Sequence, residues 1–307
     1  MKSLIRWCAL SSLALWVISC AYADTATTTV VPLAKLFDPE HQRPITSQNE
    51  GVKVVLRGSP GAFNLEIQSE SGQKRLVALP DTFAQVDSIE WPTKGRIAVL
   101  GMVNGDGGVV GLVNPITAAV EDVFFGYEIT ISPNKRYVAF AKYFAPHAGY
   151  ENTEDQVRYY DLTLAPASNR PIRSREPLFE AGVPVYPMPD KDGTMRSNVD
   201  TPPSDAYDIA SEFRWSEDSK EFVVLLVHGG YELKLLQAVP GGPVSIADIS
   251  RMCSTHCQFV TGKNLEFSSP QDGITFDLVG FGQFVGARKH EVIKNQELSR
   301  IAQKDGK

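Results

Sequence analysis

The side chains best suited to chemistry gather in one stretch of the sequence, residues 144–156. It contains His147, which suits a general base, and two carboxylates, Glu151 and Asp155, either of which can orient the imidazole ring. Proximity along the chain does not bring these three groups together in space. A small hydrolase or lyase with this site is therefore one hypothesis, and it is the alternative to the one we favour.

The favoured hypothesis treats the same stretch as a recognition surface without catalytic residues. A tight hairpin needs two to five residues in its loop, but the segment between Tyr143 and Val157 is much longer. A second insertion, residues 166–208, is rich in proline. Aromatic side chains on stiff loops bind proteins or peptides with little loss of side-chain entropy. The predicted binding residues are Tyr143, His147, Tyr150, Tyr186 and Tyr207.

The first 23 residues have the organisation of a secretory signal peptide. Lys2 and Arg6 precede an apolar stretch, and Ala21-Tyr22-Ala23 forms an A-x-A cleavage pattern. The apolar stretch is shorter than the roughly 20 residues that span a bilayer. We therefore predict a soluble mature chain in the bacterial periplasm or outside the cell. The alternative is a lipid anchor at Cys20, which ends a lipobox-like run.

Cleavage leaves two cysteines, Cys253 and Cys257, in the run CSTHC. An oxidising compartment favours a disulfide between them. Two thiolates and the imidazole of His256 are also ligands for zinc or copper, but a tetrahedral site needs a distant fourth ligand. We predict the disulfide, with no metal and no cofactor.

The mature chain is acidic. Without Lys2 and Arg6 it has 28 basic side chains against 36 acidic ones, a net charge of −8. Binding to a phosphate backbone requires clustered Lys and Arg. The composition argues against nucleic acid and anionic lipid, and the expected partner is a protein or peptide of the cell envelope.

The elements that would carry these loops follow a repeated pattern. Phe213–Leu226 reads FRWSEDSKEFVVLL, an alternating triplet that ends one strand, a polar turn, and an apolar run that forms the antiparallel neighbour. Three similar copies begin near Ser88, Glu128 and Leu265. The sequence therefore predicts four hairpins of one kind.

The copies follow a nearly constant period. Trp91 and Ile131 are 40 residues apart, and Ile131 and Trp215 are 84 apart, which is two steps of 42. Trp215 and Phe267 are 52 apart, which is one step with an insertion. A step near 40 to 45 residues is typical of four-stranded propeller blades. A β-sandwich is the alternative, although nothing in a sandwich requires this period. The aromatic residues are expected in the core between neighbouring sheets.

The run Trp215-Ser216-Glu217-Asp218-Ser219-Lys220, followed by an apolar strand, resembles the WD40-like repeat of TolB-type and prolyl-oligopeptidase-type β-propellers. The resemblance covers about residues 90–280. It implies a propeller whose loops and central channel bind proteins, peptides or small ligands, and it says little about chemistry. Residues 24–47 and 166–208 depart from the repeat, so the number of blades stays open.

Residues 287–301 are rich in helix formers and carry a thin apolar stripe, which predicts a short helix. The sequence thus predicts a signal peptide (1–23), an all-β, propeller-like domain of four-stranded antiparallel blades (24–285), and a C-terminal helix and tail (286–307). The predicted function is an exported binding module.

Overall fold

The computed structural model describes ten segments of the chain. All of them belong to the unit Arg43–Lys307. They are residues 45–103, 107–142, 156–164, 181–186, 208–228, 232–252, 260–268, 273–280, 288–294 and 298–301.

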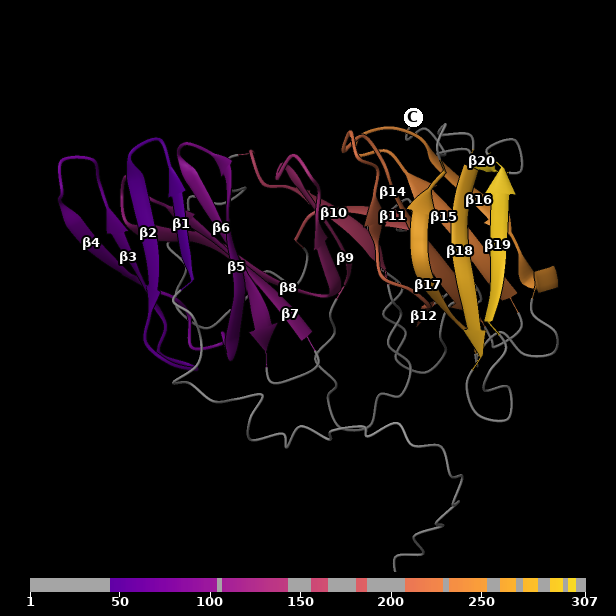
Figure 1. Ribbon diagram of the computed structural model, residues 1–307, viewed down its shortest axis with the longest axis horizontal. Helices are drawn as coiled ribbons and strands as arrows, with labels where there is room; N and C mark the ends of the chain where they lie inside the picture. The colour runs from indigo at the N-terminus through magenta and orange to yellow at the C-terminus, as the bar shows by residue number, and fades with distance from the viewer. Residues whose placement is uncertain are drawn as a thin grey trace, which may run out of the picture. The chain divides into compact units, whose positions relative to one another are not determined.

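These residues form antiparallel sheets, and their one helical element is the single 3-10 turn η1, Ser250–Met252 (Figure 1). The first sheet contains β1 (Thr46–Asn49), β2 (Val52–Arg57), β3 (Asn64–Gln68) and β4 (Lys74–Ala78), and the fourth contains β17 (Val260–Phe267), β18 (Gly273–Gly280) and β19 (Arg288–Lys294). The second runs in order through β5 (Gln85–Thr93), β6 (Arg96–Val103), β7 (Gly107–Asn114), β8 (Ala119–Ile131), β9 (Tyr137–Lys142), β10 (Val157–Asp161) and β11 (Val183–Tyr186). The third contains β12 (Asp208–Ile209), β13 (Arg214–Trp215), β14 (Phe222–His228), β15 (Glu232–Ala238), β16 (Val244–Asp248) and β20 (Ser299–Ile301).

The long strand β8 divides the second sheet into two halves. Its first part pairs with β7 up to Gly126, and its second part pairs with β9 from Gly126 to Ile131. A β-bulge separates Tyr127 from Thr130, and Glu128 within it has a φ of 50°. A bulge bends a strand and breaks its ladder locally. The sheet therefore turns at this point, and β8 serves both halves.

Apolar side chains fill the spaces between sheets that are consecutive in the chain, and between the two halves of the second sheet. The run of apolar residues in β14 illustrates the cause: Val224 packs toward the second sheet and Leu225 toward the fourth. Successive strand residues point to opposite faces, so a sheet covered on both faces has no polar alternation. Leu65 and Val109 belong to the cluster between the first and second sheets, and Phe124 and Phe140 to the cluster between the two halves of the second sheet. Ala139 and Phe222 belong to the cluster between the second and third sheets, and Leu225 and Phe276 to the cluster between the third and fourth.

The core residue of each predicted repeat occupies an equivalent place. Trp91, Ile131, Trp215 and Phe267 each pack in the cluster that joins their own sheet, or half-sheet, to the preceding one. The expectation of a core position is confirmed for Trp215, which is buried, whereas Trp91 and Phe267 are partly buried against their clusters. The preceding unit thus covers apolar side chains of each repeat unit.

The two tryptophans also make equivalent hydrogen bonds. The indole Nε1 of Trp91 donates to Ser47 Oγ in β1 at 2.8 Å, and that of Trp215 donates to Thr130 O in β8 at 3.0 Å. In both cases the acceptor lies on the first strand of the preceding sheet or half-sheet. A buried indole N–H needs such a partner, so the contact specifies how consecutive units pack.

The polar turns repeat at the level of single hydrogen bonds. Ser132 Oγ accepts from the backbone N–H of Tyr137 at 2.9 Å, and Ser216 Oγ accepts from that of Glu221 at 3.2 Å. Both serines are buried, and a buried hydroxyl must be satisfied. Each serine also donates to the side chain two residues ahead, Asn134 (2.8 Å) or Asp218 (2.9 Å).

The described residues show no closed ring of sheets. The fourth sheet has three strands, and the strand that follows it, β20, pairs with β16 of the third sheet instead. The C-terminal part of the chain thereby connects the last two sheets.

The helix predicted for the C-terminal part is wrong, because the chain there forms β19 and β20. Along β19 the burial alternates: Ile293 is fully buried, whereas Val292 is 49% exposed. Both are β-branched and suit a strand. The edge of β18 offers unpaired backbone groups and an apolar surface, and these outweigh the small helix preferences of the neighbouring charged residues.

The alternation along β19 gives a stability test. Ile293→Ala should lower the free energy of unfolding by about 2–5 kcal/mol, because it leaves a cavity in the core. Val292→Ala should change it by less than about 0.5 kcal/mol. Urea unfolding of both variants measures the difference, and equal effects of the two changes would contradict the strand.

Candidate functional site

Most side chains that the sequence nominates for a site lie outside the described residues. Their catalytic, binding and disulfide roles stay predictions, as do the signal peptide and the lipid anchor at Cys20. The side chains are Tyr143, His147, Tyr150, Glu151, Asp155, Tyr207, Cys253 and Cys257.

Tyr186 is described, and it lies in a strand rather than a loop. It is the last residue of β11, where it is paired with Val157 of β10. Its ring is partly buried against the cluster between the second and third sheets. The insertion 166–208 thus contributes an edge strand to the second sheet, and the part of Tyr186 in partner binding stays a prediction.

A cleft of about 460 Å³ opens where the second, third and fourth sheets meet. Ligand sites typically measure about 300–1,000 Å³. Buried side chains, Phe213, Trp215 and Leu265, form its base. The exposed side chains of its rim are mostly charged: Glu212, Arg214, Glu217, Lys263 and Glu266.

The first strands of three consecutive repeats supply this cleft. They are the second part of β8, the segment that contains β13, and β17. Two of these strands have the same bulge: Glu128 has a φ of 50° and Asn264 a φ of 52°. Each of these residues stands three positions before the core residue of its repeat, and Glu212 stands at the same position in the third copy. A bulge re-aims a side chain away from the ladder.

Charged side chains of both signs lie in and beside the cleft, within electrostatic reach of one another. Partial burial raises the pKa of Glu128, the charge of Glu212 raises this pKa further, and Lys263 opposes the shift. The side chains of these three residues make no hydrogen bond or ion pair with any described part of the chain. Of these three groups, the carboxylate of Glu212 and the ammonium group of Lys263 line the cleft and can face a ligand.

Sequence reasoning missed this site, because it searched the loops for reactive residue types. A signal was present in the register of the repeats. The position three residues before each core residue holds a polar side chain in every copy: Ser88, Glu128, Glu212 and Asn264.

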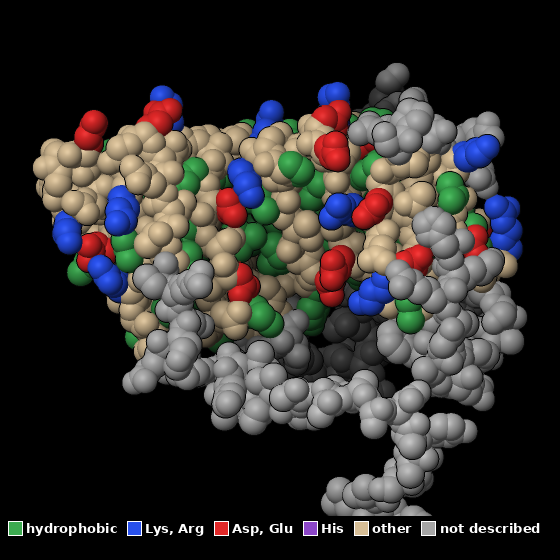
Figure 2. All heavy atoms as spheres, in the orientation of Figure 1, with side chains coloured by type: hydrophobic (Ala, Val, Ile, Leu, Met, Phe, Trp, Pro, Cys, Tyr) green, Lys and Arg blue, Asp and Glu red, His purple; other side chains and the backbone are tan. Residues whose placement is uncertain are grey.

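Charged side chains elsewhere are interspersed. On the face drawn in Figure 2, acidic and basic side chains alternate over the described part of the surface. No three His, Cys, Asp or Glu side chains within the described segments cluster so as to hold a metal ion. In those segments, too, no helix has the length and hydropathy to cross a membrane.

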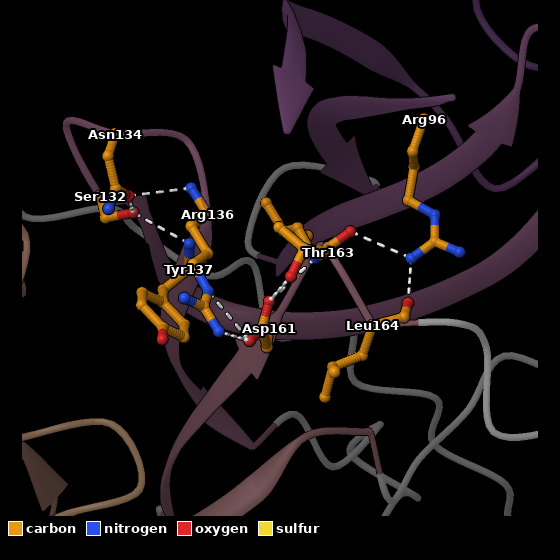
Figure 3. A network of polar contacts seen from close by, with 9 residues as sticks. Arg96, Ser132, Asn134, Arg136, Tyr137, Asp161, Thr163 and Leu164 are labelled. Atoms are coloured by element: carbon orange, nitrogen blue, oxygen red, sulfur yellow. Dashed lines mark hydrogen bonds and ion pairs between the residues drawn. The ribbon is translucent and has the colours of Figure 1, made fainter. Parts of the chain in front are cut away.

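A second polar group of side chains lies around the end of β10 and serves packing (Figure 3). Arg136 donates to Asp161 Oδ2 from Nε at 3.1 Å and from Nη2 at 2.9 Å. Arg96, which is nearly buried, donates from Nη1 to the backbone oxygens of Leu162, at 3.0 Å, and of Leu164. These contacts link the hairpin turns of the second sheet to the end of β10, and they leave the charged groups paired.

Asp122 is the most buried carboxylate in this region, with 1% of its surface exposed. Its Oδ2 accepts a hydrogen bond from the Tyr160 hydroxyl at 3.0 Å, and the Tyr160 ring stacks on Phe124. Burial raises the pKa of Asp122, and the hydrogen bond from Tyr160 and the charge of Arg96 reduce this shift. Ionisation of Asp122 therefore lowers the stability of the folded protein.

Replacement of Asp122 tests this cost. A carboxyl group whose pKa is raised on folding stabilises the protein most at low pH, and this stabilisation is lost as pH rises from the ordinary pKa of 3.8 through the raised value. Asp122→Asn keeps an acceptor for Tyr160 but cannot ionise, so its stability relative to the natural protein should increase from pH 3 to pH 7. Urea unfolding at several pH values measures this.

Asp122→Ala provides the control, because it removes the acceptor. It should lower the free energy of unfolding by about 1–3 kcal/mol, since the partly buried Tyr160 hydroxyl loses its partner. If the free energies of unfolding of Asp122→Asn and the natural protein differed by the same amount at every pH, the raised pKa of Asp122 would be contradicted.

Comparisons with known proteins assign no family. No family model matches the sequence, and no curated protein matches it either. Among solved structures, the chain is similar to a prolyl endopeptidase (12% identity, TM-score 0.33, 82% of this chain and 41% of the other) and to TolB from Acinetobacter baumannii (12%, 0.31, 81% and 53%). It is also similar to a putative 6-phosphogluconolactonase from Bacteroides uniformis (9%, 0.30, 83% and 73%).

The chain therefore spans about two fifths of the prolyl endopeptidase and about half of TolB. At these identities and TM-scores the likenesses assign neither a family nor an activity. The resemblance to WD40-like propeller repeats stays a prediction, and the described fold is all-β with antiparallel sheets.

Proposed function

We propose that this protein is an exported, non-catalytic binding module with propeller-like blades, and that its ligand, a protein, a peptide or a small molecule, enters the cleft between β8, β13 and β17. The observation that carries the proposal is the convergence of the first strands of three consecutive repeats on one cleft with a charged rim. In a propeller the blades surround a central channel, and in this proposal the cleft corresponds to a part of that channel.

Equivalent contacts between consecutive units support the propeller-like part of the proposal. Trp91 and Trp215 each bond to the first strand of the unit before them. A tandem array in which each unit covers the next can be extended without a change of geometry. The two halves of the second sheet count as two blades in this interpretation, with the bulge in β8 as the junction.

The form of the cleft supports binding. Its base consists of buried core residues, so a ligand would meet a surface that is already ordered. Its rim presents charged side chains that need little rearrangement to reach a ligand. The long segments 143–155 and 187–207 supply the further binding residues that the sequence predicts, and residues 1–23 supply the export signal.

A bulky residue in the cleft tests the proposal. Glu266 lines the cleft and is exposed, so Glu266→Trp should fill the space without disturbing the core. Short peptides and small molecules would be screened against residues 24–307 by thermal shift, and the dissociation constants of the hits measured by calorimetry. We expect Glu266→Trp to raise these dissociation constants at least about tenfold, which corresponds to a loss of 1.4 kcal/mol of binding free energy.

The matched control is Glu70→Trp, since Glu70 is exposed in the turn between β3 and β4, outside the cleft. It should leave the dissociation constants unchanged. Ligands that bind the Glu266→Trp protein as tightly as the natural one would place the binding surface elsewhere, and Tyr150→Ala and Tyr186→Ala would then test the alternative surface.

A further inference from the structure

Three strand edges without a neighbouring strand meet at the cleft. Among the described strands, the second part of β8 pairs only with β9, β13 pairs only with β14, and β17 pairs only with β18. All three strands line the cleft. The free edge of a strand presents backbone N–H and C=O groups that can pair with another chain. The cleft therefore contains backbone groups of this kind as well as side chains.

The register of β13 shows which of its backbone groups are unpaired. The N–H of Ser216 donates to Glu221 O at 2.9 Å, directly after Trp215. In an antiparallel ladder, pairs that exchange hydrogen bonds alternate with pairs that do not. Arg214 therefore exchanges hydrogen bonds with Val223, whereas the backbone N–H and C=O of Trp215 point away from β14. They have no hydrogen-bond partner among the described residues.

Phe213 continues the same edge. Its side chain and that of Trp215 are buried toward the second sheet, whereas Glu212 and Arg214 are exposed. This alternation is that of an extended strand, in which residues two positions apart direct their backbone groups to the same edge. The backbone of Phe213, too, makes no hydrogen bond to a described residue on this edge. Phe213 and Trp215 thus carry unpaired N–H and C=O groups at strand spacing in the wall of the cleft.

The edge of β17 touches this segment at one end and is separate from it beyond. The N–H of Gly262 donates to Ala210 O at 2.7 Å, and Thr261 Oγ1 donates to the same oxygen at 3.1 Å. A Cβ atom at Gly262 would lie 2.2 Å from Leu225 Cδ1, so only glycine permits this approach. Past this contact, no hydrogen bond joins the two edges within the described residues, and both line the cleft. The cleft is therefore a fork between two strand edges.

The two sides of the fork differ in chemistry. On the side of the second sheet, the cleft is lined by Ile131 and Pro133, and on the side of the fourth sheet by Lys263 and Glu266. The side chains of an extended chain in the fork would point alternately to these two sides. A whole sheet cannot enter a cleft of about 460 Å³, but a single extended segment can. The form of the fork therefore favours one peptide chain with alternating apolar and polar residues.

We propose that the cleft binds an extended peptide segment, which adds a strand to the unpaired edge at Phe213 and Trp215. The main chain of the peptide supplies the hydrogen bonds, and its alternate side chains supply the specificity. This inference rests on the proposed function, since it specifies the ligand class of the same cleft. It leaves out ligands that lack a strand-like backbone.

Periodic sensitivity to N-methylation tests the strand addition. Peptides that bind residues 24–307 are selected from a displayed library of short random peptides. Each is then remade with a methyl group on one amide nitrogen at a time, which removes one N–H donor and changes no side chain. In an added strand only alternate N–H groups face the protein. We expect N-methylation to raise the dissociation constant at least about threefold at alternate positions, and to have little effect at the positions between them.

Hydrogen exchange followed by NMR tests the protein edge. The Trp215 N–H should exchange faster than the Arg214 N–H in the free protein, and at least about tenfold more slowly when peptide is bound. The Arg214 N–H is the matched control, because β14 pairs with it in both states. Protection of Trp215 equal to that of Arg214 in the free protein would contradict the unpaired edge.

The outcomes separate this inference from the proposed function. Peptides that lose affinity in Glu266→Trp but show neither the alternation nor protection of the Trp215 N–H would overturn strand addition and keep the cleft as the binding site. A library without binders to the cleft would also overturn it, whereas small molecules that bind there would still support the proposed function. Binding of every ligand unaffected by Glu266→Trp would reject the cleft itself.

Discussion

The fold depends on covering both faces of each inner sheet. Strands such as β14 carry apolar side chains on both sides, and a sheet of that kind is stable only between two others. Consecutive units meet this requirement in chain order, and Trp91 and Trp215 provide the same indole hydrogen bond at two of the junctions. A polar N–H inside an apolar interface has few acceptable positions, so the contact restricts how the units are placed.

The strands that carry this packing also present the cleft. The bulge in β8 ends the regular pairing beside Glu128, and the bulge in β17 does the same beside Asn264. A regular ladder would direct these side chains by simple alternation. The interruption leaves Glu128 and Asn264 outside the regular pairing, three positions before the core residue of the same strand. The polar residues in and beside the cleft therefore occupy a fixed position of the repeat.

Buried and exposed charges have different roles in this chain. Asp122 is satisfied by Tyr160 inside the second sheet, and Asp161 is satisfied by Arg136 at the turn. Those groups hold elements together. Glu212 lines the cleft and Glu128 lies within electrostatic reach of Glu212, and neither side chain makes a hydrogen bond or ion pair with the described residues. All four side chains are carboxylates, so charge does not distinguish them. Asp122 and Asp161 differ from Glu128 and Glu212 in having a hydrogen-bond partner within the fold.

The sequence by itself determined the strands, the hairpins and the core role of Trp215, because period-2 apolar patterns and polar turns are local signals. It was wrong about residues 288–294, where local helix preference is weak and pairing with β18 decides. Only the tertiary structure brought Glu212 and Lys263 to one cleft, since residues 51 positions apart meet there through the packing of successive units. Local sequence encodes the unit, whereas the contacts between units decide which of its side chains converge.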